Sequence, residues 1–79
     1  MKTTKKEITK NVKRFPVMNM NNKVCGYNYQ YRLNESTLFD CRYNENFKVM
    51  RHHGPNSYHI GEATTKAEFV KTVYDYINI

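Results

Sequence analysis

Basic side chains are the residues of this sequence best suited to contacting another molecule. Lys and Arg number 13 against seven Asp and Glu, which gives a formal net charge of +6. This balance favours a polyanionic partner: nucleic acid, an anionic membrane surface or an acidic protein patch. The basic residues concentrate in an N-terminal segment with a helical pattern and on one face of a predicted sheet. The candidate binding residues are Lys5, Lys6, Lys10, Lys13, Arg32, Arg42 and Lys48.

Histidine is the other residue type that suggests chemistry, at His52, His53 and His59. Adjacent residues of a strand point to opposite faces, so His52 and His53 are not expected to bind one metal ion. A general-acid role beside Arg51 would suit a small ribonuclease, but no nucleophile or carboxylate constellation in the sequence supports it. We therefore predict a protein that is not an enzyme, with no catalytic residue, no metal, no cofactor and no small-molecule substrate.

The two cysteines, Cys25 and Cys41, lack the CxxC spacing of a redox motif or a zinc site. We expect both to be buried on the core face as reduced thiols. The N-terminal segment is charged and has no apolar stretch like that of a signal peptide. No apolar run approaches the length of a membrane span, so we expect a cytoplasmic protein without a membrane partner.

Two helices are predicted, each after a threonine with a glutamate three residues later, as in a capping box. The first follows Thr4 and runs over residues 5–14, with Pro16 ending it. Its apolar stripe, at spacings of four and three residues, consists of Ile8, Val12 and Phe15. A short extended segment is expected over residues 17–20. The second helix follows Thr65 and runs over residues 66–77.

Period-two alternation predicts strands over residues 23–33, 37–43 and 47–52, and a fourth short strand over 58–62. The short turns set a register that keeps the aromatic side chains on one face, and a one-residue slip would scatter them. The expected cross-strand pairs are Tyr27–Tyr43, Tyr29–Cys41, Tyr31–Phe39 and Cys41–Val49. The sequence therefore predicts one α+β domain over residues 1–79. It has two layers: an antiparallel meander of three to four strands, with both helices on the aromatic face.

The two faces of this sheet have different expected roles. Tyr27, Tyr29 and Tyr31 would suit base stacking on single-stranded nucleic acid, but the helices need this aromatic face for packing. The opposite face is basic and rich in hydrogen-bonding groups, which suits phosphates or an acidic partner surface. Its predicted rows are Asn28–Arg42–Lys48, Gln30–Asp40–Met50 and Arg32–Leu38–His52.

The helix–strand–helix order resembles that of the double-stranded-RNA-binding domain, most closely over the seven residues 61–67, GEATTKA. The resemblance implies a passage from the last strand into the second helix. That family has a cluster of lysines here, whereas this segment has Lys66 alone. The order also resembles that of small HicA-type ribonuclease toxins, whose histidine motif lies earlier in the chain than His52 and His53. Neither resemblance identifies the chain as a member of a family.

Three functions follow from these observations. The first is a small non-enzymatic binding protein that docks a basic surface on nucleic acid or on a nucleic-acid-processing complex. The second is a protein inhibitor of a host defence enzyme, of the anti-CRISPR or anti-restriction type, acting by occlusion. The third is a small ribonuclease toxin that uses His52 and His53. Nine Lys and ten Asn indicate an AT-rich genome, which suggests a phage or mobile element as the source. The sequence leaves the oligomeric state open.

Overall fold

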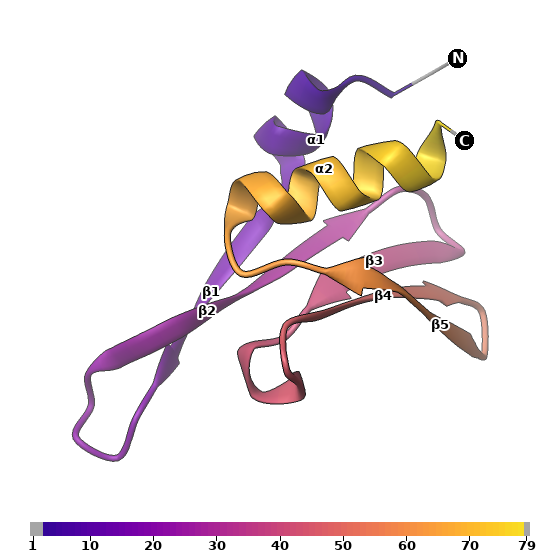
Figure 1. Cartoon of the computed structure of the whole chain (residues 1–79). Helices are drawn as coiled ribbons and strands as arrows, with labels where there is room; N and C mark the ends of the chain where they lie inside the picture. The colour runs from indigo at the N-terminus through magenta and orange to yellow at the C-terminus, as the bar shows by residue number, and fades with distance from the viewer. Residues whose placement is uncertain (1–2, 79) are drawn as a thin grey trace.

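The computed structural model describes residues 3–78, which form a five-stranded antiparallel sheet and two α-helices (Figure 1). The strands follow one another in the sheet in chain order, and both helices lie on the same face. This arrangement confirms the predicted α+β class and meander, with one strand more than expected. The elements are α1 (Lys5–Asn11), β1 (Lys13–Met18), β2 (Val24–Arg32), β3 (Thr37–Cys41), the 3-10 turn η1 (Tyr43–Glu45), β4 (Lys48–His53), β5 (Asn56–Glu62) and α2 (Lys66–Ile77).

The added strand is β1, and it corrects the predicted extent of the first helix. Helix α1 ends at Asn11, and the backbone is already extended at Val12. Proline disfavours helical geometry at the residue before it, so Phe15 takes the extended conformation. Pro16 has no N–H to donate, but β1 is an edge strand and tolerates it. Phe15 is consequently 48% exposed rather than part of a helical apolar stripe.

The core lies between the helices and the aromatic face of the sheet. The predicted pairs Tyr29–Cys41, Tyr31–Phe39 and Cys41–Val49 are all confirmed by the strand register. The buried residues are Ile8, Tyr29, Tyr31, Phe39, Cys41, Val49, Ala63, Phe69, Val70 and Val73. Tyr29 and Tyr31 therefore serve packing and are not a platform for bases. Both predicted caps also form, because Thr4 and Thr65 accept hydrogen bonds from the backbones of Glu7 and Glu68 at 3.2 Å.

The fourth predicted pair, Tyr27–Tyr43, does not form because β3 ends at Cys41 and Tyr43 begins η1. The Tyr43 ring instead lies over Gly26 of β2, which has no side chain to obstruct it. Tyr43 also donates its backbone N–H to the side-chain oxygen of Asn28 (2.8 Å) and packs edge-on against Phe47. These contacts fix the body-side end of the β1–β2 hairpin.

Beyond this point the hairpin projects away from both helices (Figure 1). We call residues 17–25 the arm. It contributes to an elongated shape, with principal extents of 45, 28 and 20 Å. Cys25 lies on the arm and is exposed, so the expectation that it is buried is wrong. The alternation of β2 continues past the area that the helices cover, and alternation alone does not reveal where that cover ends. Within residues 3–78, no helix has the length and apolarity needed to cross a membrane.

Candidate nucleic-acid interface

The net charge of the protein comes from the N-terminal part of its sequence. Residues 1–33 contain eight Lys and Arg and one Glu, whereas residues 34–79 contain five Lys and Arg and six Asp and Glu. The first segment therefore has a formal charge of +7 and the second −1. In the structure the first segment supplies α1, β1 and β2. The charge asymmetry of the sequence thus becomes an asymmetry between two parts of the fold.

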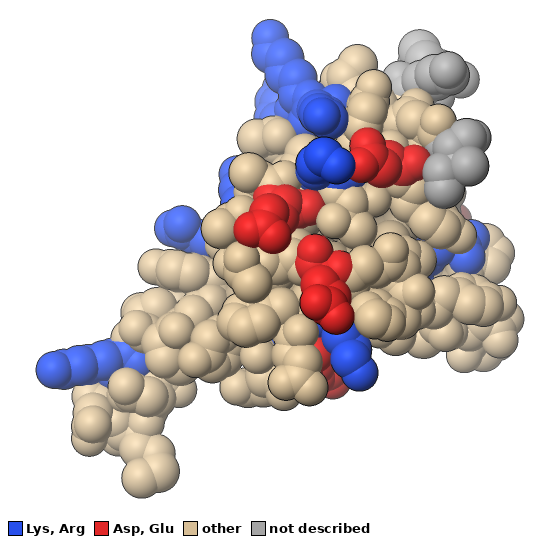
Figure 2. Space-filling model, viewed as in Figure 1, with Lys and Arg blue, Asp and Glu red and all other residues tan. Residues whose placement is uncertain are grey.

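The basic side chains of this segment lie along one border of the molecule, which we call the basic edge. Figure 2 shows Lys and Arg along the border that α1 and the hairpin form, and Asp and Glu nearer the centre of that view. Within residues 3–33 the acidic side chain is Glu7. The basic edge consists of Lys5, Lys6, Lys10, Lys13, Arg14, Lys23 and Arg32, all of which are exposed.

Two adjacent residues of β1 place positive charge on both faces of the edge strand. Lys13 lies opposite Gln30 and Arg14 opposite Tyr29, so their side chains point to opposite sides of the sheet. The Arg14 guanidinium is 4.5 Å from the centroid of the Tyr27 ring, a cation–π contact that orients it. Charges on an edge strand also discourage pairing with another sheet. That explanation applies to β1 but not to the lysines of α1.

Lys13 and Arg32 line the same surface pocket, together with Asn11, Gln30, Tyr31 and Leu33. Two cationic groups beside two side-chain amides offer several hydrogen-bond donors to one anion. One Arg32 nitrogen already donates to the carbonyls of Asn34 and Glu35 at 3.3 Å, which holds the side chain in place. The pocket is therefore the part of the basic edge best equipped for a phosphate group.

The seven predicted binding residues divide between two places. Lys5, Lys6, Lys10, Lys13 and Arg32 belong to the basic edge, although Lys13 lies on β1 and not on a helix as expected.

Arg42 and Lys48 lie apart from the basic edge, among acidic side chains. Arg42 is 3.6 Å from both Asp40 and Glu45, and Lys48 lies across from Glu62 in the sheet. Arg14 and Lys23 are members of the edge that the prediction missed. Counting charges by segment would have found them.

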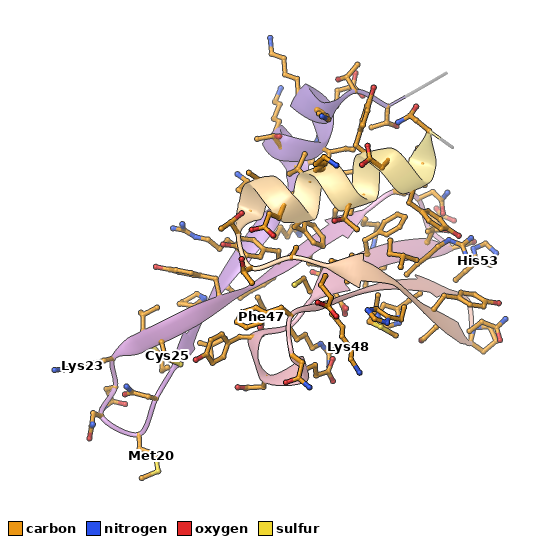
Figure 3. All side chains as sticks on the ribbon, viewed as in Figure 1. Met20, Lys23, Cys25, Phe47, Lys48 and His53 are labelled. Atoms are coloured by element: carbon orange, nitrogen blue, oxygen red, sulfur yellow. The ribbon has the colours of Figure 1, made fainter. Side chains whose placement is uncertain are left out.

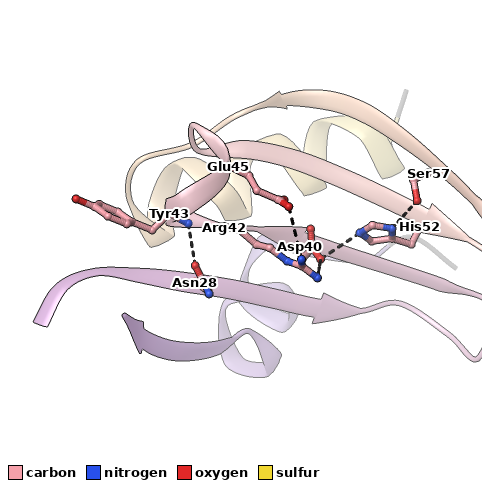
Figure 4. A network of polar contacts seen from close by, with 7 residues as sticks. All are labelled: Asn28, Asp40, Arg42, Tyr43, Glu45, His52 and Ser57. Carbon is pink, nitrogen blue, oxygen red and sulfur yellow. Dashed lines mark hydrogen bonds and ion pairs between the residues drawn. The ribbon is translucent and has the colours of Figure 1, made fainter. Parts of the chain in front are cut away.

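The outer face of the sheet carries a polar network around Asp40 (Figure 4). The predicted rows Gln30–Asp40–Met50 and Arg32–Leu38–His52 are confirmed by the register. Asp40 is only 7% exposed. Its carboxylate is 3.1 Å from Nε2 of His52, and Nδ1 of His52 is 2.8 Å from the Ser57 hydroxyl. Buried charge without a partner is costly, so this network stabilises a carboxylate in the middle of the sheet.

The network corrects the expectation that no carboxylate accompanies the histidines. With Nε2 donating to Asp40, Nδ1 of His52 accepts from Ser57, an orientation in which imidazole polarises the serine hydroxyl. His53 points to the other face and is 2.9 Å from Thr37, and His59 donates to the Gly61 carbonyl at 2.8 Å. The three histidines thus each have a partner within the protein. Among residues 3–78, no three His, Cys, Asp or Glu side chains are grouped to hold a metal ion.

The two cysteines differ in exposure. Burial raises the pKa of the Cys41 thiol to about 11, and its Sγ donates to the Ala63 carbonyl 3.1 Å away. Cys41 therefore remains a protonated, unreactive core residue at neutral pH, as predicted. Cys25 is exposed on the arm, and its Sγ is 3.3 Å from the Val17 carbonyl.

Comparison with known proteins does not add to this description. No protein-family model, curated protein or solved structure matches the chain, so its function has to be inferred from its own residues.

Proposed function

We propose that this protein binds nucleic acid along the basic edge, without catalysing a reaction. The observation that carries the proposal is the segregation of charge: seven exposed Lys and Arg lie on one border, and the remainder of the chain is nearly neutral. Electrostatic attraction to a phosphate backbone depends on such a concentration of positive charge. The scattered charge needed only for solubility would not require it.

The composition of the edge favours phosphate contacts over reading of bases. Five of its seven members are lysines, which act as flexible point charges. Phosphate contacts position a protein on nucleic acid but carry no sequence information. Binding should therefore depend weakly on sequence and steeply on salt. With five phosphate contacts, the slope of log K against log salt concentration is about −4.5.

A direct test measures the affinity for a fluorescent 30-base-pair duplex by anisotropy between about 50 and 200 mM salt. The test variant replaces Lys6, Lys10 and Lys13 with Gln. The control variant replaces Arg42, Lys48 and Arg51 with Gln, which removes the same charge from outside the basic edge. Lys66 and Lys71 are kept in both variants because they line a pocket with Lys5 of the edge. Each phosphate contact contributes about eightfold at 0.1 M salt, so the test variant should bind up to about 500-fold more weakly. Its salt slope should also fall in magnitude by about 2.7.

The control should change both quantities far less than the test variant does. Equal losses in the two variants would mean that only net charge matters, which would contradict an interface at the basic edge. Affinity pulldown with and without nuclease addresses the inhibitor alternative. One stoichiometric protein partner that resists nuclease, together with no affinity for duplex, would favour direct inhibition of a protein.

A further inference from the structure

The tip of the arm is a turn held by its own side chains and backbone. The Asn19 side-chain oxygen accepts hydrogen bonds from the backbones of Asn21 (2.8 Å) and Lys23 (3.1 Å). Asn19 also donates its N–H to the Lys23 carbonyl (2.8 Å), and Asn22 donates to the Asn19 carbonyl (3.0 Å). Asn22 has a φ of 61°, which asparagine tolerates better than most residues. These residues account for the shape of the turn.

Met20 has no role in forming this turn. It is 99% exposed and points away from the body of the protein at the end of the arm (Figure 3). Behind it lie Met18 and Val24, a cross-strand pair that is 52% and 48% exposed. Single exposed apolar residues are ordinary, but a projecting tip that ends in three of them marks a contact surface.

The base of the arm is anchored to the body of the protein. Tyr43 covers Gly26, and Tyr43 is bonded to Asn28, so the hairpin is fixed where the arm begins. Val17 lies opposite Gly26, and Met20 is three residues further along. At about 3.3 Å per residue, the tip reaches roughly 10 Å beyond that point. The minor groove of B-form DNA is about 7.5 Å deep.

We propose that the arm enters the minor groove of duplex DNA and that Met20 inserts between two base pairs and bends the duplex. The inference rests on the proposed function, because the basic edge must first hold the phosphates on either side. Apolar side chains such as methionine act as wedges in the minor groove, where they unstack a base step and kink DNA by about 20–90°. The neighbouring Asn21, Asn22 and Lys23 are residue types that bind groove acceptors and phosphates.

Charge around the arm favours DNA over an apolar pocket of a protein as its occupant. Lys23 lies at the tip (Figure 3), and Arg14 and Lys13 precede the arm on β1. An apolar protein pocket would desolvate Lys23 without a partner for it. Beside a groove, the same lysine meets a phosphate while Met20 meets the stacked bases. Duplex DNA thus offers a partner both for the charge of Lys23 and for the apolar side chain of Met20.

The test uses the full chain and a 30-base-pair duplex with a fluorescent donor and acceptor at its two ends. The wild-type protein should bind and raise energy transfer, because bending brings the ends together. Met20→Ser should bind with a loss much smaller than that of the triple lysine variant but should leave energy transfer at the level of free DNA. Met20→Leu keeps an apolar wedge and should restore the bend.

Cys25 supplies a second readout on the same complex. Alkylation of this exposed thiol should slow when the wild-type protein is saturated with duplex, while buried Cys41 stays unmodified throughout. Binding without bending, a bend that persists in Met20→Ser, or unprotected Cys25 would each overturn the insertion and leave the basic-edge proposal standing. Absence of any duplex binding would overturn both.

Discussion

Gly26 lies where the arm begins, and the effect of replacing it on protein stability should depend on the neighbouring Tyr43 ring. A Cβ added at Gly26 would fall on Cδ2 of Tyr43, with the Cγ and Cε2 atoms 2.8 and 2.7 Å away. These atoms belong to a ring held by its contact with Phe47 and by the backbone bond to Asn28, so it has little freedom to move. The substitution Gly26→Ala should therefore disturb the anchoring of the arm.

The magnitude follows from two opposing terms. Overpacking of this kind costs about 1–3 kcal/mol. Replacing a strand glycine with alanine returns about 0.5–1 kcal/mol, because glycine loses more conformational entropy on folding. In the wild-type background the overpacking cost exceeds the entropy gain, so Gly26→Ala should lower the free energy of unfolding. The decrease is largest if the overpacking cost is near 3 kcal/mol. In a Tyr43→Ala background the clash is gone, and the same substitution should raise it by about 0.5–1 kcal/mol.

The measurement is urea unfolding of the wild type, the two single variants and the double variant, followed by far-ultraviolet circular dichroism. A domain of this size shifts its Tm by about 4–8 °C for each kcal/mol, so thermal unfolding offers an independent reading. The coupling free energy between positions 26 and 43 should be at least about 1 kcal/mol, the lower bound of overpacking. If Gly26→Ala has the same sign and size in both backgrounds, the Tyr43 ring is not what makes Gly26 necessary.

Two further predictions concern the cysteines and the charge of the edge. Cys25 should react with a thiol reagent in the native protein, and Cys41 should react only on unfolding. Burial raises the Cys41 pKa from 9.0 to about 11. The contribution of the protonated Cys41 thiol to the free energy of unfolding should therefore be complete below pH 9 and lost as pH rises toward 11. That loss, about 2.7 kcal/mol at most, should be absent from the stability–pH profile of Cys41→Ala, and equal slopes for the two proteins would refute it. Added salt should raise the Tm of the wild type by screening repulsion among the edge residues, and should raise it less in the variant with Lys6, Lys10 and Lys13 replaced by Gln; a Tm that falls with salt in the wild type would contradict net repulsion.

The sheet register was predictable because two independent features agreed on it. Strand alternation places Tyr29, Tyr31 and Phe39 on one face, and the short turns allow few other pairings. The first helix was harder, since Ile8, Val12 and Phe15 at helical spacing extend the predicted helix to residue 14, whereas residues 13–18 form a strand. The helix ends at Asn11, before the residues that Pro16 restricts, and pairing with β2 determines the conformation of residues 13–18.

The candidate site was predictable in part for a physical reason. Charge is visible in a sequence, and five of the seven edge residues were named from it. Their arrangement depends on β1, which brings Lys13 and Arg32 to one pocket from distant positions in the chain. The arm could not be predicted, because apolar residues of a strand normally indicate core. Only the three-dimensional extent of the helices shows that Met18, Met20 and Val24 lie beyond it.

The basic edge is poorly explained by the stability of the fold. Helix α1 contributes one fully buried side chain, Ile8, yet carries three lysines, and two of them lie in its first turn, where they oppose the helix dipole. The edge cations also repel one another along a single border. Methionine at a fully exposed tip likewise contributes nothing to the core. Unfavourable features are retained where function requires them. Here the unfavourable charge and the unfavourable apolar exposure occur in the same 33 residues, which is the distribution expected if one ligand uses both.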